Sequence, residues 1–132
     1  MILLDTNVVI HYLKGEPSVV ARIQAMEAPD LAIPSVVAYE LEYGTLKAAS
    51  PRRRELVTRL LADSVQVPFD HAAASEAARI RLELERQSMV IGPLNLLIAG
   101  TAASRGAVLV TNNTKEFARV AGLRLADWTR PL

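Results

Sequence analysis

The sequence predicts an α/β fold in which a central parallel sheet is covered by helices, giving three layers, α/β/α. Short apolar runs alternate with longer amphipathic segments along the chain, and strands that alternate with helices form parallel sheets. The runs are almost wholly apolar, which is typical of strands buried on both faces. A chain of 132 residues fits one domain, over residues 1–132, that can bury a core without disulfides.

The first half of the chain begins with an apolar run over 1–4, which predicts a buried strand that ends at Asp5. Apolar residues at helical spacing predict helices over 8–13, 18–26, 36–48 and 51–63, with Ser35 as the N-cap of the third helix. The short apolar runs 31–33 and 65–67 predict the second and third strands.

The second half contains the clearest strand of the chain, over 107–111, which is rich in β-branched residues. Before this strand we expect a long helix over 71–87, a Gly-Pro break, and an almost wholly apolar helix that runs to Ala103. After it we expect a short helix over 115–120 and an edge strand over 123–125.

Composition excludes several classes of site. The chain has no cysteine, so it can form neither a disulfide nor a thiolate metal site. Its two histidines lack the spacing of a zinc site, and no Gly-rich phosphate loop is present. Because neither a signal peptide nor an apolar run of about 18 residues occurs, we expect a cytoplasmic protein without a membrane segment.

The formal net charge of +1 is too small to indicate a nucleic-acid-binding protein by itself. Any such role must depend on where the charges lie. One basic cluster, Arg52 to Arg54 with Arg59, is a candidate, although the solvated first turn of a helix is the simpler interpretation.

Asp5 is the first candidate functional residue, because it stands where a buried strand ends. A buried carboxylate without a partner is strongly unfavourable, so Asp5 needs a cation, hydrogen-bond donors or solvent beside it. Asp5, Thr6 and Asn7 also favour the N-cap position of a helix. From these residues alone, capping and metal chemistry are both open.

Other oxygen-bearing side chains stand at equivalent places. Thr111 and Asn113 stand at the end of the 107–111 strand, Asn95 lies in the first turn of the preceding helix, and Glu40 lies in the helix after the second strand. Ligands of such sheets bind beyond the carboxyl ends of the strands, and Mg²⁺ prefers oxygen ligands, including one or two carboxylates. These positions indicate a metal site, although helix-surface roles for Glu40 and Asn95 and a turn role for Asn113 are open as well.

The sequence resembles the PIN-domain family, and within it the VapC-type toxins of bacterial toxin–antitoxin pairs. The resemblance covers nearly the whole chain through the motifs LLDTN at 3–7, SVVAYEL at 35–41 with Gly44, IGPLNLLIA at 91–99, VTNNTKEF at 110–117 and GLRLADW at 122–128. It implies a PIN-like fold and a Mg²⁺- or Mn²⁺-dependent endoribonuclease that cuts structured RNA. It also implies a VapB-like antitoxin as partner, a homodimer, and contact with operator DNA only through the antitoxin complex.

The resemblance also implies roles for individual residues. Asp5 corresponds to the first metal-binding acid, Glu40 to the second and position 95 to the third. Asn113 stands where many relatives have a fourth acid, for which Glu116 can partly substitute. Two hydroxyl donors, Thr6 and Thr111, would support the site.

Position 95 departs from the family pattern, which has an aspartate where this chain has Asn95. An amide keeps one acceptor oxygen but loses the charge, and its NH₂ cannot ligate a hard cation. We therefore expect weakened metal binding and a nuclease with little or no activity. Two origins are open, a substitution introduced to inactivate a toxic protein and a natural variant of feeble activity, and the close fit of the flanking residues favours the first.

The alternative function is a catalytically dead PIN-like module that acts by binding an antitoxin or another partner. A ribonuclease assay of the Asn95→Asp variant separates the two functions, because only the nuclease gains activity when the acid is restored.

Overall fold

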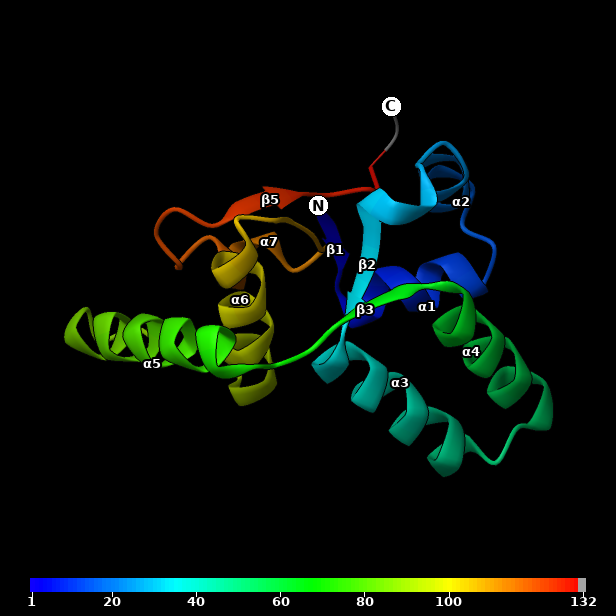
Figure 1. Ribbon diagram of the computed structural model, residues 1–132, viewed down its shortest axis with the longest axis horizontal. Coiled ribbons are helices and arrows are strands. Elements are labelled where there is room, and N and C mark those ends of the chain that lie inside the picture. Colours follow the sequence, from blue (N-terminus) through cyan, green and yellow to red (C-terminus); the bar gives the residue numbers. More distant parts are fainter. Residues whose placement is uncertain (131–132) are drawn as a thin grey trace.

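A single sheet of five parallel strands, in the order β3-β2-β1-β4-β5, organises the computed structural model, which describes residues 1–130 (Figure 1). The strands are β1 (Ile2–Leu4), β2 (Leu31–Pro34), β3 (Val65–Val67), β4 (Val108–Val110) and β5 (Arg124–Ala126). Helices flank this sheet, so the predicted α/β class is confirmed.

Helices fill the connections between the strands. They are α1 (Thr6–Leu13), α2 (Pro17–Gln24), the 3₁₀ turn η1 (Ala28–Asp30), α3 (Ser35–Ala48), α4 (Pro51–Asp63), α5 (His71–Arg86), α6 (Pro93–Arg105) and α7 (Thr114–Phe117). Within residues 1–130, none of these helices has the length and apolar content needed to cross a lipid bilayer.

Two predicted helix ends are wrong. Ser35 does not cap α3 but is its first residue, and Pro34 occupies the N-cap without a side-chain hydrogen bond. The reason is that β2 runs through Pro34 directly into the helix, so no residue is left between them. The short helix predicted over 115–120 ends at Phe117, after which the amides of Arg119 and Val120 bond three residues back, in turns.

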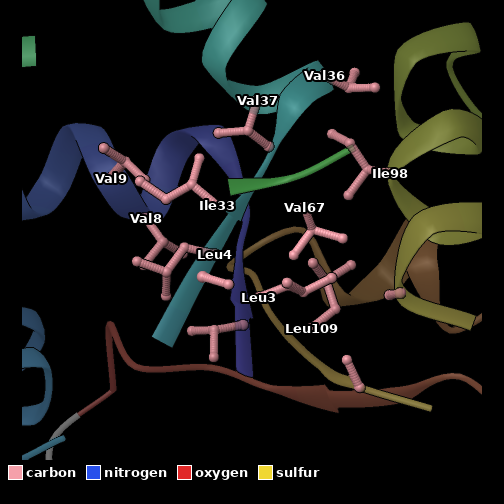
Figure 2. Close-up of a cluster of buried hydrophobic side chains, with 14 of the residues drawn as sticks. Leu3, Leu4, Val8, Val9, Ile33, Val36, Val37, Val67, Ile98 and Leu109 are labelled. Atoms are coloured by element: carbon pink, nitrogen blue, oxygen red, sulfur yellow. The ribbon is translucent and has the colours of Figure 1, made fainter. Parts of the chain in front are cut away.

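The hydrophobic core lies on both sides of the central strand β1 (Figure 2). Leu3 and Leu4 of β1 are buried, as are Val8 of α1 and Ile98 of α6. Figure 2 shows the strands between α1 and α6, with Val8 and Ile98 on opposite sides. Burial on both faces explains why the strand segments are apolar without alternation.

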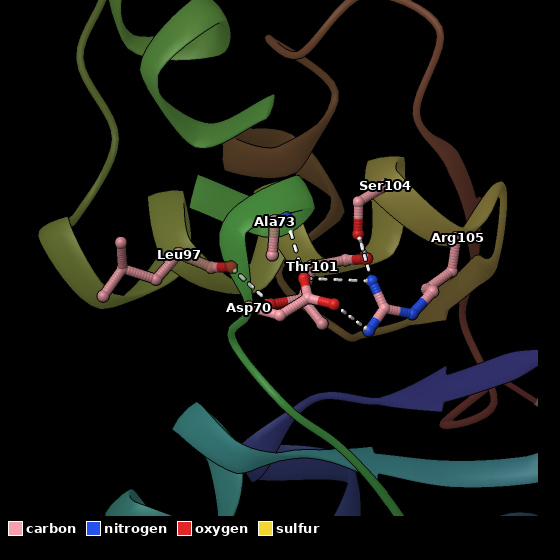
Figure 3. Close-up of polar contacts among 6 residues, drawn as sticks. All are labelled: Asp70, Ala73, Leu97, Thr101, Ser104 and Arg105. Carbon is pink, nitrogen blue, oxygen red and sulfur yellow. Dashed lines mark hydrogen bonds and ion pairs between the residues drawn. The ribbon is translucent and has the colours of Figure 1, made fainter. Parts of the chain in front are cut away.

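The helices α5 and α6 approach each other closely at Gly100. A Cβ atom added there would lie 2.7 Å from the Ala77 Cβ and 2.8 Å from the Ala73 carbonyl oxygen. The pair is also joined by an ion pair of 3.0 Å between Asp70, the N-cap of α5, and Arg105 at the end of α6 (Figure 3). Hydrogen bonds from the Ala73 N–H and from Arg105 lower the pKa of Asp70. The packing at Gly100 and the Asp70–Arg105 ion pair together hold α6 against α5. The first turn of α6 carries Asn95.

Candidate metal centre

The parallel pairing of β1 and β4 places Asp5 beside Thr111. Leu4 pairs with Val110, so the next residue of each strand emerges at the same edge of the sheet. The Asp5 N–H donates to the Val110 carbonyl at 2.9 Å. Both side chains are buried, with 4% of Asp5 and 0% of Thr111 exposed.

The Asp5 carboxylate takes part in two sets of contacts. Its Oδ1 accepts from the Thr6 N–H at 2.8 Å, which makes it the N-cap of α1 and confirms the capping interpretation. Its Oδ2 accepts from the Thr111 hydroxyl at 2.7 Å. Burial raises the pKa of Asp5 despite these two bonds, and the negative charge of Glu116 raises it further. Burial therefore disfavours the charged carboxylate, and a nearby cation would stabilise it.

Glu40 reaches the same place from α3. Because β2 continues directly into α3, the second turn of this helix stays close to the sheet edge. The Thr6 hydroxyl donates to Glu40 Oε1 at 2.8 Å. Thr6 thus donates its backbone N–H to Asp5 and its hydroxyl to Glu40. These two bonds hold both carboxylates beside Thr6.

Glu116 of α7 forms the other side of the cluster. Its Oε1 accepts from the Asn95 amide at 3.3 Å and from the Gly92 N–H, and its Oε2 accepts from the Asn113 amide at 3.0 Å. These bonds, with that from Gly92 first, lower the pKa of Glu116. The role of the Gly92 amide was not predicted, and the Gly-Pro break before α6 is its only sequence signal.

One further bond joins the two sides. The Asn113 N–H donates to the Thr111 hydroxyl oxygen at 3.0 Å. A continuous hydrogen-bonded chain therefore brings together every predicted site residue, in the order Glu40, Thr6, Asp5, Thr111, Asn113, Glu116 and Asn95.

The Asn112–His11 contact and the basic cluster of α4 lie outside this hydrogen-bonded cluster. The Asn112 amide lies 3.4 Å from His11 Nε2. The cluster from Arg52 to Arg54 lies in the first turn of α4, where Ser50 accepts from the Arg53 N–H at 3.3 Å as the N-cap. The predicted position of Arg52 to Arg54 in the first turn of a helix is therefore confirmed.

The side chains offer the kind of oxygen groups that suit a hard divalent cation. Asp5 and Glu40 supply two carboxylates, which suffice for an ion such as Mg²⁺ that keeps several waters. Asn95 supplies no charge, and its NH₂ donates to Glu116. Within residues 1–130, no three His, Cys, Asp or Glu residues form a group that could hold a metal. The donor types, two carboxylates and one amide oxygen, suit such an ion, but they carry less negative charge than an aspartate at 95 would provide.

Comparison with known proteins identifies similar sequences over nearly the whole chain. The PIN domain family matches residues 2–123. The chain is 41% identical over 128 residues to a protein of Shigella flexneri named tRNA(fMet)-specific endonuclease VapC, covering 96% of this chain and 97% of that protein. It is 37% identical over 127 residues to a Salmonella typhimurium protein of the same name, covering 96% of each.

Solved structures give the same result. The crystal structure of DNA-bound VapBC from Salmonella typhimurium superimposes with a TM-score of 0.90 at 36% identity, covering 96% of this chain and 97% of that chain. VapBC2 from Rickettsia felis, bound to a DNA fragment from its promoter, superimposes with a TM-score of 0.87 at 32% identity, covering 97% of this chain and 99% of that chain.

Proposed function

Because the chain belongs to the PIN-domain family, we propose that it is the toxin of a toxin–antitoxin pair, a metal-dependent endoribonuclease that hydrolyses RNA phosphodiester bonds in the cytoplasm. The observation that carries the proposal is the hydrogen-bonded chain from Glu40 to Asn95, because it brings together the four positions for which the resemblance implies acids, two of them carboxylates here and two of them amides. Two relatives are named for tRNA(fMet), so this tRNA is the first substrate to test.

Mg²⁺ or Mn²⁺ would be held by Asp5 and Glu40, with at most an amide oxygen from Asn95. A bound divalent ion supplies an acidic water and offsets the charge that develops on the scissile phosphate. The residues of the chain orient the ligands. The Thr111 hydroxyl fixes Asp5 and the Thr6 hydroxyl fixes Glu40, and each carboxylate keeps lone pairs for a cation. No covalent enzyme intermediate is needed.

We propose partners of the kind found in the solved relatives. Both structures are VapBC complexes bound to DNA. The proposed partners are accordingly a VapB-like antitoxin, operator DNA through the antitoxin complex, and a second copy of the chain in a homodimer.

A second function, a catalytically dead binding module, is favoured by one observation. The Asn95 NH₂ donates to Glu116, a bond that an ionised aspartate could not make because it has no donor. The Asn95 amide donates a hydrogen bond to Glu116 and adds no negative charge that would attract a cation. The fold and any partner-binding surfaces would be unaffected.

The Asn95→Asp variant tests both proposals. We expect it to cleave tRNA(fMet) in Mg²⁺ on the order of 100-fold faster than the chain with Asn95, because changes near metal ligands commonly alter activity by about 10–100-fold. Gel analysis of the end-labelled tRNA measures the rate.

The double variant Asp5→Asn/Asn95→Asp is the matched control and should be inactive, as should the single variant in EDTA. Equal rates for the parent chain and the Asn95→Asp variant would contradict the proposed effect of the amide. If the Asn95→Asp variant cleaves no RNA yet binds an antitoxin, the dead binding module is the correct function.

A further inference from the structure

The helix α3 leads from the metal centre to the turn before α4, away from the sheet (Figure 1). Its inner face is buried through Val37, Leu41 and Thr45, which are spaced four residues apart. Tyr43 and Lys47 follow Glu40 by three and seven residues. At 3.6 residues per turn they lie on the same side of the helix as Glu40, about 5 and 10 Å farther along its axis. Along α3 from Glu40 at the candidate metal centre, this side of the helix therefore carries the exposed ring of Tyr43 and then the cation of Lys47.

The Tyr43 ring has no role in the core. Tyr43 is 56% exposed, and Leu46 on the next turn is 65% exposed. A surface hollow of about 320 Å³ begins at Leu46 and is lined by Thr45, Leu46, Ala49, Ser50, Pro51 and Arg54. The apolar surface therefore continues from α3 into the turn and reaches a cation at its rim.

The segment from Tyr43 to Arg54 contains four cations and no acid, and it is flanked directly by Glu42 and Glu55. The four cations are Lys47, Arg52, Arg53 and Arg54. Within residues 1–130 none of the four forms an ion pair. By contrast, Arg59 pairs with Glu55, and on α5 Arg79 pairs with two glutamates and Arg81 with one. In a protein with a net charge of +1, this concentration favours a polyanionic ligand.

We propose that this surface, made of Tyr43, Lys47 and Arg52 to Arg54, binds single-stranded RNA that runs outward from the metal centre, with one base stacked on Tyr43. The inference rests on the proposed function, which makes RNA the substrate at Glu40. Proteins that bind single strands combine a cationic track with exposed aromatic rings, because every base has a face that can stack. An apolar protein helix would use Tyr43 and Leu46 but would leave the four cations without partners.

The experiment uses the chain as it is, with Asn95, in EDTA, so that binding is measured without cleavage. The probe is a fluorescently labelled single-stranded RNA of about a dozen nucleotides, within the usual site sizes. We expect Tyr43→Leu to raise the Kd from fluorescence anisotropy about 5- to 150-fold, the range for one stacked base. Tyr43→Phe keeps the ring and should bind like the parent.

The salt dependence tests the cations separately. Replacing Arg52, Arg53 and Arg54 by Gln should reduce the slope of log K against log salt by about 2, since each phosphate contact on a single strand contributes about 0.7. Arg81→Gln removes an exposed arginine from α5, away from this surface, and should leave the slope unchanged. Circular dichroism and Tm confirm that each variant is folded.

An unchanged RNA affinity in folded Tyr43→Leu protein would overturn the inference. So would variants that bind RNA normally but lose affinity for the purified antitoxin, because the surface would then belong to the protein partner. The tRNA cleavage assay separates the two proposals. If the Asn95→Asp variant does not cleave but RNA binding depends on Tyr43, only the proposed function fails. If the Asn95→Asp variant cleaves and RNA binding is independent of Tyr43, only this inference fails.

Discussion

At the scale of single residues, Asp5 is held in a site that is unfavourable for its charge. Burial raises the pKa of Asp5, so the native state binds its proton more tightly than the unfolded state. The resulting contribution to stability is present below the unfolded pKa of about 3.9 and is lost as the pH rises through the folded pKa. At neutral pH and without metal, the charged Asp5 therefore makes the fold less stable than a neutral side chain would.

We expect Asp5→Asn to raise the Tm of the metal-free protein at pH 7 by a few degrees, because the amide removes the buried charge and keeps an acceptor for the Thr6 N–H. The difference in Tm should shrink as the pH falls toward about 4, near the unfolded pKa. Thermal denaturation in EDTA across this range measures it. A lower Tm for Asp5→Asn at pH 7 would show that the hydrogen bonds of the carboxylate outweigh its desolvation.

Glu116 is a control for Asp5, because its pKa is shifted in the opposite direction. Hydrogen bonds from Gly92 and Asn113 lower its pKa, so its contribution to stability is present above the unfolded pKa and is lost as the pH falls through the folded one. Glu116→Gln should therefore lower the Tm at pH 7. Two acids of one cluster should respond in opposite directions to neutralisation.

The residues of this cluster could be predicted from the sequence because most of them stand at the carboxyl ends of strands or in the helices that follow. The contact between Glu116 and the Gly92 N–H could not be predicted. It depends on where α7 lies against the first turn of α6, and no local pattern in the sequence encodes that distance.

At the scale of elements, two helical glycines should respond oppositely to the same substitution. Gly100→Ala places a Cβ 2.7 Å from the Ala77 Cβ and 2.8 Å from the Ala73 carbonyl, so α5 and α6 must move apart. We expect a loss of about 1–3 kcal/mol in the free energy of unfolding, the usual cost of overpacking. Chemical denaturation measures it.

Gly44 lies within α3, and an added Cβ would meet no atom within 4 Å. Gly44→Ala should therefore stabilise the protein by about 0.5–1 kcal/mol, the difference in helix propensity. If both variants changed stability in the same direction, the close packing of α5 on α6 would not be the cause of the effect at Gly100.

The helices and strands themselves were predictable because apolar spacing reports burial on one or both sides of an element. Gly44 was recognisable as an unusual residue in a helix from propensity alone. The ends of elements were less predictable. Ser35 has the chemistry of an N-cap, but the direct passage from β2 into α3 leaves that position to Pro34.

At the scale of the whole molecule, the strand order joins segments that are distant in the sequence. β1 lies between β2 and β4, so α3, which follows β2, and the turn after β4 flank Asp5 from two sides. Each of these connections contributes one part of the cluster, and a ligand bound there must therefore stabilise the fold as a unit. A ligand that binds only the native state raises stability by RT ln(1 + [L]/Kd).

This linkage gives a test of the metal site that does not depend on RNA. We expect saturating Mg²⁺ to raise the Tm of Asn95→Asp by several degrees, since ligand at about 100 times its Kd contributes about 2.7 kcal/mol. The same Mg²⁺ should raise the Tm of the Asn95 protein much less, because the amide adds no charge to Asp5 and Glu40. Without metal, Asn95→Asp should have a lower Tm than the Asn95 protein, because a carboxylate at 95 beside Glu116 adds repulsion.

The double variant Asp5→Asn/Asn95→Asp separates specific binding from a general effect of salt. This variant has an acid at 95 but lacks the buried carboxylate of Asp5. Its Tm in Mg²⁺ should therefore stay close to its Tm in a Mg²⁺-free buffer of the same ionic strength. An equal Mg²⁺ response in all three proteins would show that the ion acts on surface charge and not at this cluster. A response confined to Asn95→Asp would identify the neutral amide at 95 as the feature that limits metal binding, and would show that Asp5 is also required.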